Sequence, residues 1–148
     1  MSRPDVYHDA VRHALEKDGW TITHDPLTLS AGARDIYVDL GAEQPLAAEK
    51  QGRKIAVEVK SFLGLSPVRD LEGAIGQFVF YRNLLQSQEP ERRLYLAIRD
   101  TTFRGIFSEP VGQLGAGPLL IPLLIFVPEE EVIEQWIEPK SMPPSSGA

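Results

Sequence analysis

The sequence predicts one α/β domain in which a β-sheet of mixed strand direction is flanked by helices. Segments with the composition of strands occur at residues 36–40, 55–60 and 93–98, while residues 6–18 and 67–86 repeat apolar side chains at helical spacing. The chain has 148 residues, of which 43% are hydrophobic and 24% are charged, and this suffices for one hydrophobic core. The expected order is helix, three strands, helix and strand, followed by an appended pair of strands.

Composition restricts the function further. The chain contains no cysteine, which excludes disulfides, thiolate metal sites and cysteine nucleophiles. Its net charge of −6 argues against a general nucleic-acid coat. No apolar run is long enough to span a membrane and no charged-then-apolar leader is present, so a cytoplasmic protein without membrane contact is expected. Residues 1–138 are expected to form the domain, and the Pro- and Ser-rich residues 139–148 a disordered tail.

The N-terminal third should contain a helix and an outer strand. Ser2 and Asp5 have the spacing of a capping box, which predicts a helix to about Asp18, and Gly19 is a typical residue after a helix end. Residues 20–23 are rich in strand-forming side chains. Residues 24–34 contain Pro, Ser and Gly and are predicted to form a loop.

The middle of the chain should place a long helix behind the central strands. The strands at residues 36–40 and 55–60 are joined by a segment whose tip, residues 50–53, has turn composition. Ser66 and Pro67 form a helix start signal, and the helix should continue to about Gln86. Gly73 and Gly76 are expected to let this helix approach the sheet closely.

The last third should complete the sheet. Residues 93–98 are apolar without alternation, as in a strand covered on both faces and parallel to its neighbour. Residues 100–102 could cap a short helix broken near Pro110, and the Gly-rich residues 112–118 read as a connection. Residues 119–127 are expected to form a strand. Residues 132–137 fit either a hairpin strand, which we favour, or a helix.

Charged residues on the central strands form the candidate site. Because side chains alternate along a strand, Glu58 and Lys60 should share one face of the sheet. If Asp39 lies on the neighbouring strand, two carboxylates and a lysine converge. This set could hold Mg²⁺ or Mn²⁺ through Asp39, Glu58 and the carbonyl of Val59, while Lys60 orients a water or stabilises charge at a phosphodiester.

Several residues remain alternatives or accessories. Asp35 has the same parity as Asp39 and competes with it as first ligand. The first helix could add Asp9, Glu16 or His8, whose simpler role is that of surface charges. Gln77 and Tyr81, one helical turn apart, either position Lys60 or a phosphate or satisfy each other. Two tryptophans are expected in the core or an interface rather than under nucleic-acid bases, because no basic residues surround them: Trp20 and Trp136.

Asp39 followed by Glu58-Val59-Lys60 on a strand and then a helix resembles the PD-(D/E)xK nuclease superfamily. Val38 stands where the usual motif has proline. Gln77 and Tyr81 resemble the Q-x-x-x-Y motif of the RecB-like branch. This resemblance implies a restriction-endonuclease-like αβββαβ core and a Mg²⁺-dependent endonuclease centre.

Most of the chain resembles the XisH family. The segments that carry this resemblance are YHDAV, KDGWTITHDPLTL, RDIYVDLGAE, AAEK, IAVEVKSFLG, DLEGAIGQFVFYR and VIEQWI. It implies a cyanobacterial controlling factor for excision of the fdxN DNA element, acting on DNA with the small partner XisI and the site-specific recombinase XisF. Two hypotheses follow: a nuclease-like protein that processes DNA, or an inactive nuclease fold that assembles these partners. The oligomeric state stays open, a homo-oligomer included.

Overall fold

The computed structural model describes residues 5–45 and 52–139. Three predictions therefore lie wholly or partly outside the described residues: the helix cap at Ser2, the first half of the turn at residues 50–53, and nearly all of the tail at residues 139–148. Within the described ranges, no helix is long and apolar enough to cross a membrane.

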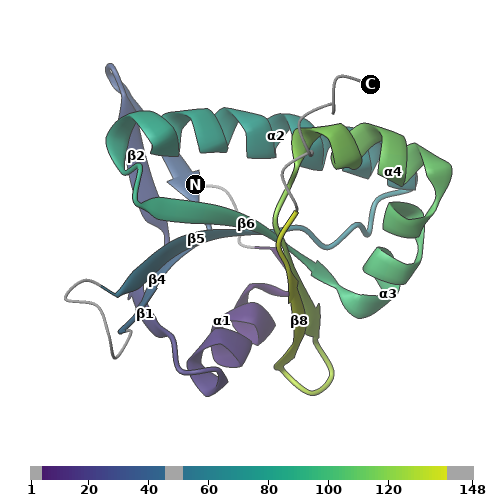
Figure 1. Ribbon diagram of the computed structural model, residues 1–148, viewed down its shortest axis with the longest axis horizontal. Helices are drawn as coiled ribbons and strands as arrows, with labels where there is room; N and C mark the ends of the chain where they lie inside the picture. Colours follow the sequence, from purple (N-terminus) through teal and green to yellow (C-terminus); the bar gives the residue numbers. More distant parts are fainter. Residues whose placement is uncertain (1–4, 46–51, 140–148) are drawn as a thin grey trace, which may run out of the picture.

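The described residues form a mixed six-stranded sheet in the order β1-β4-β5-β6-β7-β8 (Figure 1). Neighbouring strands are antiparallel except for the two central pairs, β5 with β6 and β6 with β7, which are parallel. The prediction of an α/β fold with a mixed sheet is thereby confirmed. The strands of this sheet are β1 (Thr21–His24), β4 (Leu40–Gln44), β5 (Arg53–Val59), β6 (Arg92–Arg99), β7 (Leu123–Val127) and β8 (Val132–Ile137).

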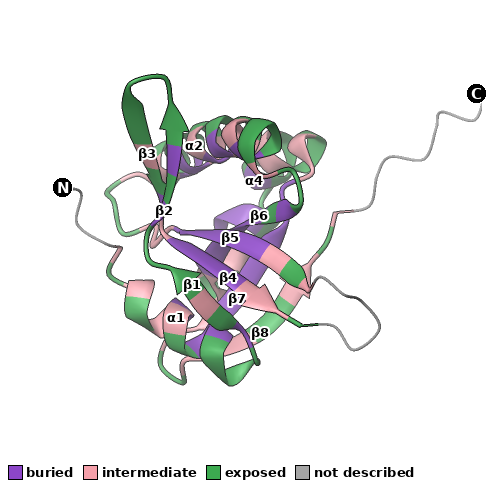
Figure 2. Ribbon diagram, turned by 90° about the vertical axis from the view of Figure 1, so that its left-hand side faces the viewer, coloured by how far each residue is buried: buried purple, intermediate pink, exposed green. Residues whose placement is uncertain are grey.

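Helices cover both faces of the sheet. α1 (His8–Lys17) packs on one face, and α2 (Pro67–Gln88) lies across the other beside α4 (Pro110–Ala116) (Figure 1). Each face has its own cluster of buried side chains: Phe78 and Leu96 belong to the cluster under α2, and Leu15 and Val57 to that under α1. Strands β5 and β6 are therefore buried on both sides (Figure 2), as the continuous apolar run of β6 predicts for that strand.

The predicted end of α1 and the predicted start of α2 are confirmed, whereas α1 begins only at His8, after Tyr7 and without a side-chain cap, and not at the predicted capping box. Gly19 follows α1 with φ +93°, a conformation that glycine adopts without steric cost. The hydroxyl of Ser66 caps α2 by accepting a hydrogen bond from the Arg69 backbone N–H at 3.2 Å. The role predicted for Gly73 and Gly76 is wrong, because both lie on the exposed side of α2 and a Cβ there would have no neighbour within 4 Å.

The loop predicted at residues 24–34 is wrong over most of its length. Residues of β2 (Leu27–Ala31) pair with β3 (Arg34–Val38) in a separate two-stranded sheet that stands beside α2 (Figure 2). Leu27 and Leu29 are buried while Thr28 and Ser30 are exposed, which is the alternation of a half-buried strand. Gly32, with φ +63°, makes the turn between the two strands.

The strand predicted at residues 36–40 is interrupted at Asp39. Residues before Asp39 belong to β3 in the small sheet, whereas Leu40 begins β4 in the large sheet. Asp39 makes its hydrogen bonds to β5 through its side chain as well as its backbone. The chain therefore changes sheets at the proposed metal ligand.

The C-terminal third corrects one element and confirms others. The connection predicted at residues 112–118 is instead helical, because Pro110 starts α4 as a first-turn proline and the 3₁₀ turn Gly117–Leu119 follows it. The short helix predicted near residues 100–107 is present as α3 (Asp100–Arg104) and a 3₁₀ turn, Ile106–Ser108. β7 begins only at Leu123, and β8 forms the favoured hairpin with it.

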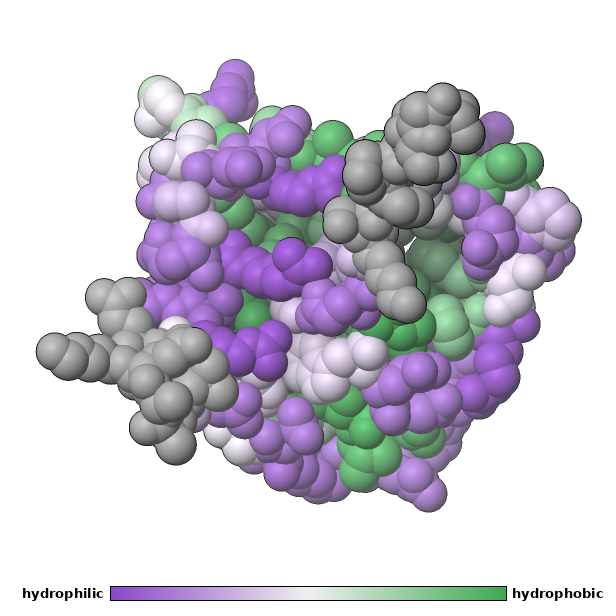
Figure 3. Space-filling view, viewed as in Figure 1, coloured by the Kyte–Doolittle hydropathy of each residue, from purple (hydrophilic) through white to green (hydrophobic). Residues whose placement is uncertain are grey.

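The tryptophan side chains lie where the sequence indicates. Trp20 is buried and Trp136 packs against the same cluster, with their rings 5.8 Å apart. The face drawn in Figure 3 mixes hydrophilic and apolar side chains. On α4, the apolar side chains of Val111 and Leu114 are exposed.

Candidate functional site

The site begins with the alternation of β5. Ile55, Val57 and Val59 join the buried cluster under α1. Ala56, on the other parity, joins the cluster under α2. Glu58 follows the parity of Ala56 and is only 5% exposed, so a carboxylate sits within the buried interface between the sheet and α2. A buried carboxylate is costly unless it is paired or protonated, and this marks the position as a functional candidate.

Asp39 and Glu58 are held together by reciprocal hydrogen bonds between β5 and the start of β4. The backbone N–H of Asp39 donates to Glu58 Oε1 at 3.2 Å, and the backbone N–H of Val59 donates to Asp39 Oδ2 at 2.8 Å. Each carboxylate thus accepts a bond from the strand that carries the other. These bonds fix the position of both carboxyl groups relative to the backbone of β5 and the start of β4.

Burial, more than the proximity of the two acids, changes their pKa values. Burial, followed by the negative charge of Asp39, raises the pKa of Glu58 from 4.5 to about 8. Burial also raises the pKa of Asp39, and this outweighs the lowering by the Val59 N–H and by Lys60. The pair therefore holds a proton at neutral pH, with Glu58 as its main carrier.

Lys60 completes the set that the sequence brings together. Its Nζ lies 3.5 Å from Glu58 Oε2, and its side chain is 29% exposed, so the ammonium group reaches from the buried acids to solvent. Its charge acts to lower the pKa of both carboxyls. The site therefore offers two acids and one cation at the end of β5.

A divalent cation fits this arrangement. Two buried carboxylates repel each other, and a cation bound between them would relieve this repulsion as the shared proton does. Carboxylate oxygens are hard ligands that suit Mg²⁺ or Mn²⁺. The N–H and C=O of a strand residue point toward the same neighbouring strand. Because the Val59 N–H donates to Asp39, the Val59 carbonyl also points toward the Asp39 side of β5. The described residues contain no cluster of three or more His, Asp or Glu side chains that could hold a metal, so further ligands would be waters.

Two further predicted residues lie on α2, and the one near the acids is Tyr81. Tyr81 is buried, and burial together with the charges of Glu58 and Asp39 raises its pKa to about 12. Gln77 lies one turn earlier, and its Oε1 is buried without a hydrogen-bond partner in the described part of the chain. The alternative in which Gln77 Oε1 and Tyr81 satisfy each other is therefore wrong.

The alternative first ligand, Asp35, lies elsewhere. It is exposed on β3, where it accepts a hydrogen bond from the Ser30 hydroxyl at 3.2 Å. Since β3 belongs to the small sheet, Asp39 is the acid that stands opposite Glu58.

Of the candidates on α1, His8 is the one that interacts with the acid pair. Burial lowers its pKa, but hydrogen bonds to Asp9 and Asp25 and the charge of Asp39 raise it overall. Asp9 is largely exposed and bonds to His8 at 3.0 Å, while Glu16 pairs with Arg12 at 3.9 Å. Asp9 and Glu16 are thus surface charges, and a protonated His8 adds positive charge near Asp39.

Sequence reasoning missed a cleft beside Lys60. The cleft has a volume of about 500 Å³ and is lined by residues of α2, by residues 60–64 and by Asp5. Asp5 ties the start of the chain to this loop by accepting bonds from the backbone N–H groups of Tyr7 and Ser61, each at 2.9 Å. No sequence signal indicates this bridge, because the two segments are distant along the chain.

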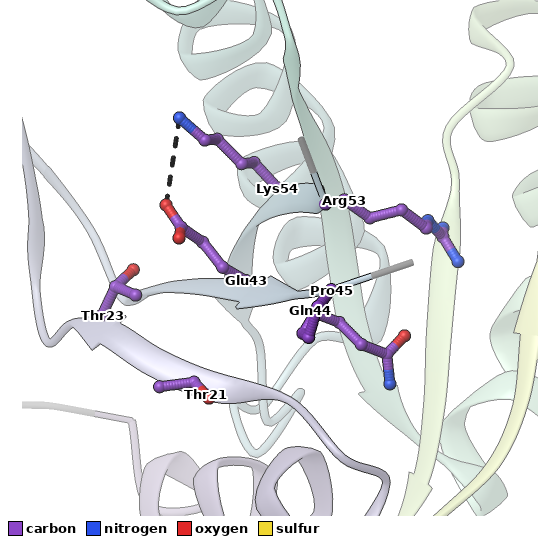
Figure 4. A pocket seen from close by; sticks show the side chains of 8 residues that line it. Thr21, Thr23, Glu43, Gln44, Pro45, Arg53 and Lys54 are labelled. Atoms are coloured by element: carbon purple, nitrogen blue, oxygen red, sulfur yellow. Dashed lines mark ion pairs between the residues drawn. The ribbon is translucent and has the colours of Figure 1, made fainter. Parts of the chain in front are cut away.

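A second hollow lies at the opposite end of β5. It has a volume of about 250 Å³, and Lys54 and Glu43 face each other across it at 3.9 Å (Figure 4). Its lining includes Pro45 and Gly52. Lys54 and Lys60 are separated by roughly 20 Å along the strand, at about 3.3 Å per residue.

Comparisons with known proteins agree with this architecture. The family model described as XisH protein matches residues 1–134. An XisH family protein from Nostoc punctiforme has a similar crystal structure, with a TM-score of 0.82 and 44% identity over 90% of this chain and 100% of that one. A fdxN element excision controlling factor protein from Anabaena variabilis gives a TM-score of 0.80 and 43% identity over 90% and 99% of the two chains. No curated protein matches. The chain therefore belongs to the XisH family.

Proposed function

We propose that this protein is a controlling factor for programmed excision of a DNA element of the fdxN type, and that it processes DNA at a metal centre formed by Asp39, Glu58 and Lys60. The observation that carries the proposal is the buried acid pair beside a lysine at the end of a central strand. This set resembles the acid, acid and lysine centre of a PD-(D/E)xK endonuclease. The order of α1, the antiparallel strands, α2 and β6 supports a restriction-endonuclease-like core, into which the hairpin of β2 and β3 is inserted.

The residues take distinct parts in this reaction. Asp39, Glu58 and the Val59 carbonyl would hold Mg²⁺ or Mn²⁺, which supplies Lewis acidity and an activated water when bound. Lys60 orients the attacking water or stabilises the negative charge that develops at the phosphodiester. Tyr81 and Gln77 lie behind these groups on α2 and position Lys60 or a phosphate. XisI and the recombinase XisF are the proposed partners on DNA.

Metal binding should appear as thermal stabilisation. Mn²⁺ at about 100 times its Kd is expected to raise the Tm by about 5–10 °C, because a ligand specific to the native state stabilises it. The rise should be larger at pH 8.5 than at pH 6, since the metal must displace the proton that Glu58 binds with a pKa of about 8. Glu58→Ala should abolish the rise, and the exposed Glu91→Ala should keep it. A rise that survives Glu58→Ala would remove Glu58 from the metal centre.

A cleavage assay tests the function itself. Plasmid and branched DNA are incubated with the natural chain and Mn²⁺, with and without XisI, and nicked or cut products are the expected result. Intact DNA in every arm, despite Mn²⁺ binding, would overturn the enzymatic role.

That outcome would favour a second function, in which an inactive nuclease fold assembles XisI and the recombinase on DNA. Two observations support it. The net charge of −6 disfavours extensive DNA contact by this chain alone. Exposed apolar side chains on the loop after β5 and on α4 offer contact area for a protein partner: Leu63, Leu65, Val111 and Leu114.

A further inference from the structure

The cleft beside Lys60 has the features of a ligand site. Its volume of about 500 Å³ falls within the roughly 300–1,000 Å³ typical of small-ligand pockets, which is space for one nucleotide but not for a duplex. Lys60 contributes to its wall while its Nζ stays 3.5 Å from Glu58. A ligand in the cleft would therefore lie directly beside the proposed centre.

Along one face of α2, a cationic side chain, a glycine without a side chain and an amide side chain follow one another. Arg69, Gly73 and Gln77 are four residues apart and so lie in one row along the helix, and all three line the cleft. Gly73 leaves open space between the two longer side chains, because a Cβ there would have no neighbour within 4 Å. Arg69 forms no ion pair with any residue in the described ranges, and its guanidinium group suits a phosphate.

The carboxylates of the cleft are engaged with backbone groups. Asp5 accepts bonds from the backbone N–H groups of Tyr7 and Ser61, and Asp70 accepts one from that of Gly64, all at 2.9 Å. These bonds turn the acidic oxygens toward the protein and partly neutralise them. The cations therefore remain the groups that can meet an anionic ligand.

The remaining wall suits a nucleobase. Phe62 and Leu63 give an apolar surface, with Leu63 65% exposed. Gln77 also lines the cleft; its Oε1 is buried, so the NH₂ group of its amide is the part that can donate a hydrogen bond to an acceptor on a base edge. Bases combine a flat apolar face with donors and acceptors on their edges, which matches both features.

We infer that this cleft binds one unpaired nucleotide of a DNA strand, with Arg69 at its phosphate and Gln77 at its base, and thereby places the adjacent phosphodiester at Lys60. The inference rests on the proposed function, because it names the substrate class of that site. It selects single-stranded or branched DNA over intact duplex.

Filling the gap at Gly73 tests the inference without removing charge. Binding of a fluorescently labelled single-stranded DNA decamer is measured by anisotropy in EDTA, so that no cleavage occurs. Gly73→Leu should weaken binding by about ten-fold or more, comparable to the loss of one base contact. Gly76→Leu is the matched control, since it lies on the same exposed helix with equally open space but outside the cleft, and its affinity should stay within about two-fold. Both variants should keep the Tm of the natural chain or exceed it, because leucine favours a helix over glycine.

Removing the charge of Arg69 provides a second, independent test of the nucleotide site. Arg69→Ala should weaken strand binding and reduce the slope of log affinity against log salt by about 0.7, the value for one phosphate contact on a single strand. Lys17→Ala, an equal change of charge on α1, should leave the slope unchanged. The labelled duplex of the same sequence should bind more weakly than the single strand to the natural chain.

The outcomes separate this inference from the proposed function. The nucleotide site is overturned if the natural chain does not bind the single strand, or if Gly73→Leu and Arg69→Ala bind it as tightly as the natural chain does. This holds even if Mn²⁺-dependent cleavage occurs. Selective loss of strand binding in Gly73→Leu and Arg69→Ala supports the site even if the protein cleaves nothing, in which case the enzymatic function fails alone.

Discussion

Replacing Glu58 by glutamine is expected to make the protein more stable than the natural chain above pH 8 and about equally stable at pH 5. Glutamine reproduces the protonated acid: its Oε1 can accept the bond from the Asp39 N–H, and its amide can donate to the Asp39 carboxylate. It carries no charge that burial must tolerate at high pH. The difference in unfolding free energy should reach the order of 3–5 kcal/mol, at about 1.4 kcal/mol per pH unit of the shift.

The direction follows from proton linkage at Glu58. Between pH 4.5 and about 8 the unfolded chain has lost the Glu58 proton while the folded chain retains it. The stability that this proton contributes is fully present below the pKa of Glu58 in the unfolded chain, and it is lost as the pH rises through the pKa of Glu58 in the folded chain. The advantage of Glu58→Gln should therefore grow through this window and level off above it.

Urea unfolding at a series of pH values measures this effect. Glu91→Gln serves as control because Glu91 is exposed, and its stability should track that of the natural chain at every pH. A flat difference between Glu58→Gln and the natural chain would show that Glu58 is ionised in the folded protein like an ordinary glutamate.

Changing Lys60→Ala is expected to reduce Mn²⁺-dependent DNA cleavage by about 100-fold or more. A cation placed where charge develops in the transition state typically contributes this much. Lys60 also acts to lower the pKa of Glu58, so its loss should leave that carboxyl more firmly protonated and a weaker metal ligand. Initial rates of plasmid nicking give the measurement.

Lys54→Ala is the matched control for this change. Lys54 is on the same strand and pairs with Glu43, but it lines the hollow at the far end of β5. It should cleave DNA at the rate of the natural chain. Equal activity of the Lys60→Ala protein would assign the cleavage to another site or to a contaminating nuclease.

Elements with strong local signals could be predicted from the sequence. Ser66 and Pro67 define the start of α2, and the continuous apolar run of β6 indicates a strand buried on both faces. The alternation along β5 places Glu58 on the face of α2 because side-chain parity is a property of any strand. These features depend on residues close together in the chain.

Features that depend on tertiary contacts could not be predicted in the same way. The short alternation of Leu27 and Leu29 becomes a strand only because α2 provides a surface to bury it. The break at Asp39 arises from hydrogen bonds to a strand that lies much later in the chain. The bridge from Asp5 to Ser61, and with it the cleft, likewise joins segments whose proximity no local pattern encodes.

The most direct test of the acid pair as a metal centre is a ¹³C NMR titration of the Glu58 carboxyl carbon, with and without Mg²⁺. The signal can be assigned by its absence in Glu58→Gln. Glu58 is expected to titrate near pH 8 in the metal-free protein and at clearly lower pH with Mg²⁺, because the cation replaces the shared proton. Titration near pH 4.5, or a midpoint that Mg²⁺ does not move, would contradict the account.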